Sequence, residues 1–433
     1  KKKKKKKKKA KTHERKMATH VVRFGMIADI QYCDTASAKS FSGRETRDYR
    51  GSLAQVQKAV IEWKGKNIDF IVNLGDTIDG KNSSMRTSQQ ALRMVFDSLK
   101  TLKVTLVHLI GNHELYNFTR EQISSFFMRN NTFSTGSPNP YYSFRPSPSP
   151  DSKWVIIALD SYQEHSIDTQ ETGPEFEAGK LHLHSMRLFH QAHIIPPNGA
   201  YGTAQRTWLK QQLAQAQANG DKVLILAHVP VAPRSCIDEC LAWDFDPVMQ
   251  VLSEFSCVCA FVAGHDHEGG YVFSKGIHFL TMPSPLLEKN VSSAHAVVEL
   301  HHDKITIESL GAVCRILEGV QIDLPLGQPK IPTSMNNPRP AKQKSEPPIV
   351  EGAPAPKPAK APVPKLSLSE SANLVEELKL LNRLQLFKLV SCCSCLCTHA
   401  STTTTSPPPP PPRRPPPRPP PLPPLPPPPP LPL

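Results

Sequence analysis

Between residues 21 and 310, short apolar runs rich in β-branched residues alternate with longer stretches in which apolar residues recur at helical spacing. Short apolar runs bounded by turn residues are typical of buried strands. Regular alternation of strands and helices predicts a layered α/β domain. The expected strands are 21–28, 68–74, 104–110, 154–159, 222–227, 257–263, 271–273, 277–281, 294–300 and 304–310, and the expected helices are 53–63, 88–102, 204–218 and 247–255.

Three stretches within this region, 40–50, 130–151 and 162–202, show neither pattern. They are long, and they are polar or contain proline. Loops of that length inside a compact domain are usually functional or disordered. We therefore expect irregular loops there.

The net charge of +14 is concentrated at the two ends of the chain. Residues 1–16 carry 12 positive and 1 negative side chains, and residues 341–433 carry 11 positive and 5 negative ones. A lysine run without apolar residues cannot pack, so we interpret 1–16 as a disordered leader or tag that precedes a domain over 17–320. That domain is mildly acidic, which argues against nucleic-acid binding.

The C-terminal quarter of the chain, from residue 321, differs in composition. Residues 321–365 are rich in Pro, Ala and Lys, as linkers are, and 366–390 has leucines at the spacing of a short amphipathic helix. Residues 391–433 combine a cysteine cluster with a disordered proline-rich tail. Such a tail is typical of ligands of SH3 or WW domains, although spurious translation past a disrupted exon would also produce it.

No apolar segment approaches the roughly 18 residues that span a bilayer, and the N-terminus lacks the apolar core of a signal peptide. The cysteines of the domain are scattered, and a domain of this size does not need disulfides. These features together predict a cytoplasmic protein.

Polar residues that can bind metals follow five of the expected strands. In open α/β sheets, ligands bind at the carboxyl ends of the strands. One such segment alone would be an ordinary turn, but five in this order indicate a metal site. The segments are Asp29-Ile30-Gln31, Gly75-Asp76-Thr77-Ile78-Asp79-Gly80, Gly111-Asn112-His113-Glu114, His228-Val229-Pro230 and Gly264-His265-Asp266-His267.

The donor types restrict the metal. Carboxylate, amide and imidazole groups without thiolates suit Mn, Fe, Zn or Mg ions. Seven donors are too many for one ion that keeps a position open, and they divide naturally between two ions that share a carboxylate. Two ions about 3.5–4 Å apart can activate a hydroxide and neutralise the charge that develops on a phosphate.

These motifs, D-x-Q, G-D-x-x-D-G, G-N-H-E, H-x-P and G-H-x-H, resemble the calcineurin-like metallophosphoesterase superfamily over residues 21–310. Its members usually open with D-x-H. The D-x-Q of this chain, the string GNHELYNF from Gly111, CLAW from Cys240 and GHDHEGGY from Gly264 are similar instead to the manganese-dependent ADP-ribose/CDP-alcohol diphosphatase family. The resemblance implies an α-β-β-α sandwich fold.

The resemblance also implies roles for individual residues. His113 would contact the substrate phosphate or protonate the leaving oxygen, and Asp79 and Glu114 would orient ligands or be merely structural. The family's first ion would be held by Asp29, Gln31 and His267, its second by Asn112, His228 and His265, and both by Asp76. Two divalent ions, Mn²⁺ or alternatively Mg²⁺, are the implied cofactors.

The implied reaction is hydrolysis of ADP-ribose to AMP and ribose 5-phosphate, and of CDP-alcohols such as CDP-choline to CMP and phosphocholine, by a hydroxide that two metal ions activate. The alternatives are a cyclic-nucleotide phosphodiesterase or phosphatase of the same superfamily, and an inactive scaffold that acts through its proline-rich tail. Substrate-binding residues remain unassigned. Ordinary loop packing explains Phe41, Tyr49, Arg50, Cys240 and Trp243 equally well, and Ser161 is interpreted as a loop residue.

Overall fold

The computed structural model describes residues 22–325, except for 41–42, 44, 128–132, 134–138, 148–151, 168–173, 188–190, 288, 290–292, 310 and 318–320. The expected leader at 1–16, the helix at 366–390 and the tail at 391–433 lie outside the described residues. So does the expected linker at 321–365, apart from its first five residues.

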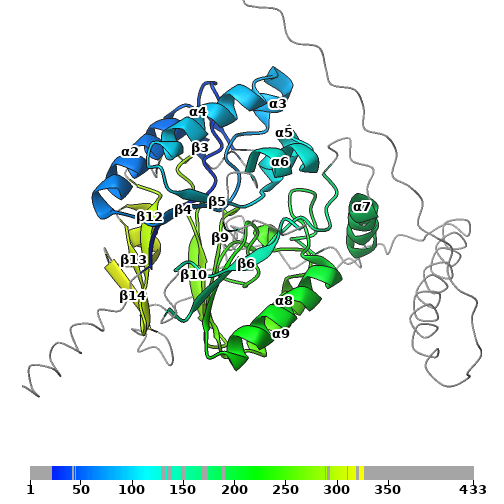
Figure 1. Cartoon of the computed structure of the whole chain (residues 1–433). Coiled ribbons are helices and arrows are strands. Elements are labelled where there is room, and N and C mark those ends of the chain that lie inside the picture. Colours follow the sequence, from blue (N-terminus) through cyan, green and yellow to red (C-terminus); the bar gives the residue numbers. More distant parts are fainter. Residues whose placement is uncertain are drawn as a thin grey trace, which may run out of the picture. The chain divides into compact units, whose positions relative to one another are not determined.

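Two six-stranded sheets form the middle of the domain (Figure 1). The first sheet contains, in spatial order, β14 (Gln321–Pro325), β13 (Lys304–Glu308), β12 (Ala296–Leu300), β1 (Val22–Ile27), β4 (Phe70–Asn73) and β5 (Thr105–His108). The second contains β10 (Gly270–Ser274), β11 (Ile277–Thr281), β9 (Val258–Ala263), β8 (Lys222–Leu226), β7 (Trp154–Ala158) and β6 (Tyr142–Phe144).

Helices lie outside the two sheets. In Figure 1, α2 (Gly51–Lys66) and α4 (Ser88–Lys100) lie on one side of the strands, and α8 (Gly202–Ala218) and α9 (Phe245–Ser253) lie on the other. The shorter elements are β2 (Ala38–Lys39), β3 (Thr46–Arg47), α3 (Lys81–Met85), α5 (Asn112–Asn117), α6 (Arg120–Phe127), α7 (Pro174–Arg187), the 3₁₀ turn η2 (Asp238–Cys240) and α10 (Ala312–Leu317).

An apolar layer joins the two sheets. Because successive side chains of a strand point to opposite faces, every second residue of β1 enters this layer. The layer combines Phe24, Met26, Phe70 and Val72 of the first sheet with Ile156, Leu224, Leu226 and Val262 of the second. A separate cluster packs the helices against the outer faces. The predicted α-β-β-α sandwich is therefore confirmed.

The structure differs from the expected elements where local pattern was weak. The stretch 130–151 contains β6, a three-residue edge strand that is too short to show alternation, and the stretch 162–202 contains α7. Strand β14 pairs antiparallel with β13, so the sheet continues past residue 320, where the sequence suggested that the domain ends. Pro325 lies at the end of this strand. The strand forms because its backbone pairs with β13, and the composition of a single segment does not reveal such pairing.

The contact between β1 and α2 depends on a glycine. Trp63 of α2 is fully buried, and its indole N–H donates a hydrogen bond to the Ala296 carbonyl at 3.0 Å. The indole lies so close to Gly25 that a Cβ there would be 2.5 Å from two ring carbons. Gly25 therefore gives the indole room to lie flat on β1.

We predict that Gly25→Ala lowers the free energy of unfolding by about 1–3 kcal/mol, because the new methyl group overpacks the core against Trp63. Gly65→Ala in α2 is the matched control, since a Cβ there meets nothing within 4 Å. It should stabilise the protein by about 0.5–1 kcal/mol through higher helix propensity. Urea denaturation measures both, and an equal effect of the two substitutions would contradict the packing argument.

Candidate metal centre

The strands that precede the predicted ligands run parallel within each sheet. Strand β4 lies parallel to both β1 and β5, and β8 lies parallel to both β7 and β9. Their carboxyl ends therefore point in one direction in each sheet, and the loops that follow them meet between the sheets. Six of the seven predicted ligands are buried there, and His265 is half-buried.

Direct contacts join most of the predicted ligands. The Gln31 amide nitrogen donates to Asp76 Oδ2 at 2.9 Å and lies 2.8 Å from His267 Nε2. His267 Nε2 in turn lies 3.7 Å from Asp29 Oδ1. On the other side of Asp76, His228 Nε2 lies 3.5 Å from Oδ1. Asp76 is thus central to the group.

The remaining two predicted ligands complete the group. Donor atoms of Asp76, His228 and His265 all lie within 4.8 Å of one another, which is close enough to hold one ion. Asn112 is the first residue of α5, and the backbone N–H of its neighbour His113 donates to Asp76 Oδ1 at 2.8 Å. The structure therefore brings all seven predicted ligands to one place.

Four of these residues adopt the left-handed backbone conformation, with φ of 52° at Asp29, 44° at Gln31, 57° at Asp76 and 71° at His265. This conformation is uncommon for residues other than glycine, and it persists only where surrounding structure enforces it. Here the Asp29 N–H donates to the Gly75 carbonyl at 3.0 Å, and the Gln31 N–H to the Asp76 carbonyl at 2.8 Å. These hydrogen bonds hold the loops in a strained backbone conformation, and that conformation sets the direction of their side chains.

The glycines of the motifs leave room for the ligands. A Cβ at Gly111 would lie 2.1 Å from Asp76 Oδ1, and one at Gly264 would lie 2.5 Å from Asp29 Oδ2. Real Cβ atoms essentially never make contacts this short, so a side chain there would displace the carboxylate. Glycine is therefore required at these positions because the backbone of one loop lies against the carboxylate of another.

The imidazoles are oriented to offer a lone pair. His228 donates its Nδ1–H to the Leu74 carbonyl at 2.9 Å, and its Nε2 is buried without a hydrogen-bond partner. Burial lowers the pKa of His228 to about 4, so the ring is neutral, as a metal ligand must be. His265 Nε2 lies 2.6 Å from Asn198 Oδ1, which leaves Nδ1 available to coordinate an ion.

These buried groups fit a cation. Gln31 Oε1, like His228 Nε2, is buried without a partner, and unsatisfied acceptors of this kind are costly. Burial raises the pKa of Asp76 to about 7 and that of Asp29 well above its usual range, because the negative charges are desolvated and close together. A divalent ion would satisfy the acceptors and neutralise the carboxylates.

Glu114 holds together the loops that follow β4 and β5. Its carboxylate accepts the N–H groups of Asp76 and Thr77 at 2.7 Å, and that of Gly111 at 2.8 Å. Burial alone would raise the pKa of Glu114, but the His108 ring, whose Nε2 lies 3.6 Å from Oε1, and the hydrogen bonds from the backbone lower it to about 2. Glu114 therefore stays ionised and acts on the ligands through the backbone.

His113 lies beside the group without being needed as a ligand. Its Nδ1 accepts the Gly80 N–H at 2.8 Å, so the neutral ring carries its proton on Nε2. That nitrogen lies 3.9 Å from Asp76 Oδ2. The Asp79 carboxylate lies 3.5 Å from Nδ1, and the ring packs edge-on against Tyr116. The Nε2–H of His113 therefore points toward the predicted ligands around Asp76.

Sequence reasoning missed several residues that serve this site. Ser161, interpreted as a loop residue, accepts the N–H of His228 at 3.1 Å. Tyr162 and Asn198 contact Asn112 and His265, and a lone polar residue in a long loop gives no sequence signal for such a contact.

Arg47 of β3 was missed as well. Its charge contributes to the lowered pKa of His267, although burial is the larger cause, and its Nε is buried without a partner. Three arginines, Arg44, Arg47 and Arg50, lie close together in this stretch, and nothing in the sequence distinguishes Arg47 from the other two. The positive charge of Arg47 therefore acts on one of the candidate ligands, His267.

Three of the residues that the sequence left unassigned are engaged within the fold. Tyr49 is 2% exposed, so its ring is not free to stack on a base. Arg50 forms an ion pair with Asp34 at 2.5 Å. Trp243 is buried and donates its indole N–H to a backbone carbonyl. Phe41 lies outside the described residues.

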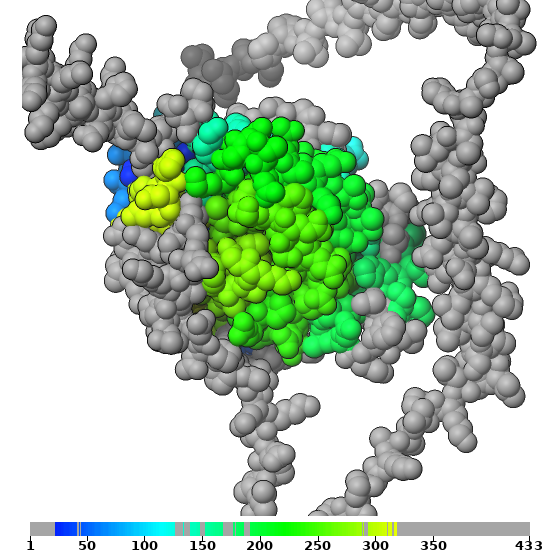
Figure 2. Space-filling view, turned by 90° about the horizontal axis from the view of Figure 1, so that it is seen from below, coloured from blue at the N-terminus to red at the C-terminus, as the bar shows by residue number. Residues whose placement is uncertain are grey.

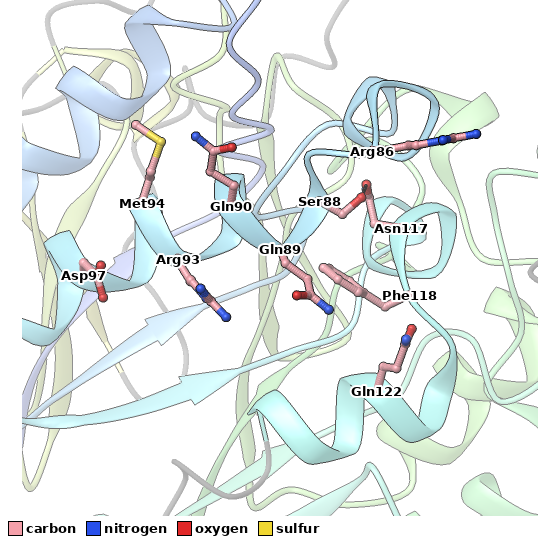
Figure 3. A pocket seen from close by; sticks show the side chains of 10 residues that line it. All are labelled: Arg86, Ser88, Gln89, Gln90, Arg93, Met94, Asp97, Asn117, Phe118 and Gln122. Carbon is pink, nitrogen blue, oxygen red and sulfur yellow. Dashed lines mark hydrogen bonds between the residues drawn. The ribbon is translucent and has the colours of Figure 1, made fainter. Parts of the chain in front are cut away.

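A separate polar cavity of about 570 Å³ lies between α4 and the segment of α5 and α6 (Figure 3). It contains none of the seven predicted ligands. Asn117 in its wall donates to the His113 carbonyl at 2.8 Å, so the cavity adjoins the back of the site rather than the site itself. Its lining residues are Arg86, Ser88, Gln89, Gln90, Arg93, Met94, Asp97, Asn117, Phe118 and Gln122.

Residues 22–269 match the family model described as calcineurin-like phosphoesterase. The chain belongs to this family. Manganese-dependent ADP-ribose/CDP-alcohol diphosphatases are similar to it along most of their length. The human protein is 30% identical over 67% of this chain and 90% of its own, and the Danio rerio protein is 32% identical over 69% and 98%.

A solved structure of a dimetal phosphatase from Danio rerio superposes with a TM-score of 0.64 at 28% identity, covering 71% of this chain and 99% of its own. These similarities confirm the resemblance that the motifs indicated. This calcineurin-like phosphoesterase is therefore a metal-dependent hydrolase of phosphoesters that uses two divalent ions. Within the described part of the chain, no helix is both long and apolar enough to cross a membrane.

We predict that Glu114→Gln lowers the free energy of unfolding by about 1–3 kcal/mol. An amide has one acceptor oxygen, so it cannot serve all three backbone N–H groups that the carboxylate serves. The matched control is Glu121→Gln on the exposed surface of α6, which should change stability by less than about 0.5 kcal/mol. Urea denaturation of the metal-free proteins compares them, and equal stabilities would show that Glu114 does not hold the loops.

Proposed function

We propose that this phosphoesterase hydrolyses the diphosphate bond of ADP-ribose, giving AMP and ribose 5-phosphate, and of CDP-alcohols such as CDP-choline, giving CMP and phosphocholine. The observation that carries the proposal is the position of Gln31, whose amide contacts both Asp76 and His267. The superfamily usually has histidine there. The relatives whose names state this activity support the same substrates.

In this proposal, Asp76 is shared between the two ions. Asp29, Gln31 and His267 hold the first ion, in agreement with the contacts that link them through Gln31 and His267. Asn112, His228 and His265 hold the second, in agreement with the close approach of His228 and His265 to Asp76. An amide oxygen at Gln31 in place of an imidazole nitrogen favours harder ions, and so fits Mn²⁺.

When bound, the two ions polarise the phosphate oxygens and make water a stronger nucleophile at neutral pH. The protein's own contribution begins with His113. Because the Gly80 N–H occupies Nδ1, the proton on Nε2 is the one directed at the substrate. We assign to this N–H a hydrogen bond to the phosphate that is attacked, which strengthens as negative charge grows in the transition state.

Arg47 fits the second phosphate of the substrate. A nucleoside diphosphate carries two adjacent phosphate groups, and guanidinium groups pair with phosphate through several hydrogen bonds. Arg47 lies close enough to His267 to influence its pKa, and its Nε has no partner in the described part of the chain. Binding of the distal phosphate there would hold the scissile bond between His113 and the ions.

The chemistry needs no protein nucleophile. Hydrolysis of a diphosphate releases a phosphomonoester, which is a better leaving group than an alkoxide. Ser161, three residues after the end of β7, is buried and its hydroxyl accepts two backbone N–H groups. It is therefore engaged in structure and is not available to attack phosphorus.

We predict that the full chain, stripped of metal and then given Mn²⁺, releases AMP from ADP-ribose and CMP from CDP-choline faster than it hydrolyses cyclic AMP or p-nitrophenyl phosphate. Separate assays with Mg²⁺ should give lower rates. Asp76→Asn is the blank and should reduce all rates to background, because it removes the shared carboxylate. Chromatography of the nucleotide products measures the four reactions.

A faster reaction with cyclic AMP or with the monoester would keep the metal centre and reject the diphosphatase proposal. Absence of turnover with all four compounds, while Mn²⁺ still binds, would favour the scaffold alternative.

We predict that His113→Gln lowers kcat for ADP-ribose by about 10²–10⁴-fold, the usual contribution of a positioned proton donor. Mn²⁺ affinity, measured by calorimetry, should be nearly unchanged because His113 is not a ligand. His184→Gln on the exposed surface of α7 is the matched control and should retain full activity. If His113→Gln loses Mn²⁺ instead of turnover, His113 belongs to the metal-binding group.

A further inference from the structure

The three proposed ligands of the second ion share a feature that those of the first ion lack. Each makes a hydrogen bond with the segment between β7 and α8, called here the β7–α8 segment and comprising the described residues of 160–201. The three residues that make these bonds are Ser161, Tyr162 and Asn198. None was recognisable in the sequence, and all three are fully buried.

Tyr162 orients Asn112. Its hydroxyl lies 3.1 Å from Asn112 Oδ1 and the same distance from the Pro197 carbonyl. The tyrosine is itself fixed, since its N–H donates to Asp160 Oδ1 at 3.0 Å and its carbonyl accepts a hydrogen bond from Arg120. A hydrogen bond to the amide oxygen from a fixed hydroxyl sets the direction in which that oxygen points.

Ser161 orients His228 through the backbone. Its Oγ accepts the N–H groups of His228 at 3.1 Å and Val229 at 3.0 Å. The serine hydroxyl in turn donates to Tyr201 at 3.2 Å, and the Tyr201 hydroxyl donates to the Val229 carbonyl at 2.6 Å. These hydrogen bonds form a closed ring that fixes the backbone at His228.

Asn198 orients the His265 ring. Its Oδ1 accepts from His265 Nε2 at 2.6 Å. Its own amide nitrogen donates to the backbone carbonyls of His193 at 2.8 Å and Leu241 at 2.9 Å, among others, so the amide cannot rotate. A histidine ligand that donates its second ring nitrogen to a fixed acceptor keeps one tautomer and one ring orientation.

The ligands of the first ion are held by other means. Asp29 receives the His265 N–H, and Ser284 donates its hydroxyl to the Asp29 carbonyl at 2.7 Å. Gln31 is held by Asp76 and His267. Within the described residues, no hydrogen bond joins the β7–α8 segment to Asp29, Gln31 or His267. Support for the two ions is therefore divided between different parts of the chain.

We propose that Ser161, Tyr162 and Asn198 are positioning residues that set the affinity of the second ion without setting that of the first. The inference rests on the ligand assignment made under the proposed function. Groups that orient metal ligands typically change metal affinity by about 10–100-fold when they are removed. The β7–α8 segment thus controls whether the centre holds one ion or two.

The test compares Mn²⁺ binding by the metal-free full chain and by its Tyr162→Phe variant. This substitution removes one hydroxyl and retains the buried ring. Calorimetry should show two sites in the unaltered protein, and in the variant one site weakened by about 10–100-fold and the other changed less than about 2-fold. Electron paramagnetic resonance at two equivalents of Mn²⁺ should show a coupled pair in the former and isolated Mn²⁺ in the latter.

Tyr271→Phe is the matched control. It removes a tyrosine hydroxyl from a hydrogen bond to His278, which is not a proposed ligand, and both sites should keep their affinity. Asn198→Ala is a second variant that should weaken the same single site, and circular dichroism verifies that each variant is folded. Agreement between Tyr162→Phe and Asn198→Ala would support a common role in holding the second ion.

Equal weakening of both sites, or two unchanged sites, in folded Tyr162→Phe and Asn198→Ala would overturn this inference while leaving the proposed hydrolysis intact. Binding of only one Mn²⁺ by the unaltered chain would overturn the ligand assignment as well. Product formation from ADP-ribose by the unaltered chain separates these two failures.

Discussion

The interaction on which the site depends is the burial of the Asp76 carboxylate between the two sheets. It accepts hydrogen bonds from Gln31 and from the His113 backbone, and it lies 3.5 Å from His228. Three loops from the first sheet and one from the second therefore converge on a single charged group. Because that charge is desolvated, the arrangement is stable only with compensation, and neighbouring groups are placed to share a cation.

The backbone is arranged before any ion binds. Left-handed residues, glycines that lie against carboxylates, and the Glu114 carboxylate each fix a loop through contacts that involve protein atoms only. Burial of the apolar layers on either side of each sheet stabilises the fold and so offsets the free energy of this strain. A centre organised in this way does not need to rearrange when an ion or a substrate enters. Preorganised sites avoid the free-energy cost of that rearrangement.

The sequence predicted the strands that carry ligands because short apolar runs and the polar residues after them are local signals. The seven ligands that it predicted lie together at the strand ends, and their binding of metal stays a prediction. It did not predict Ser161, Tyr162 or Asn198, because their roles depend on hydrogen bonds across many residues and on a loop with no periodic pattern. Strand β14 was missed for a similar reason, since its pairing with β13 outweighs a composition that resembles a linker.

The apolar layer between the sheets has a consequence for the dimensions of the centre. The loops that carry Asp29, Gln31, Asp76 and Asn112 leave the first sheet, whereas those that carry the histidines leave the second. The side chains that separate the sheets act as a spacer. They lie beneath the surface that Figure 2 shows, where green residues of the second half of the fold cover the face in view. Their combined volume sets the distance between the two groups of ligands. The packing of a core that contains no ligand therefore determines the dimensions of the metal centre.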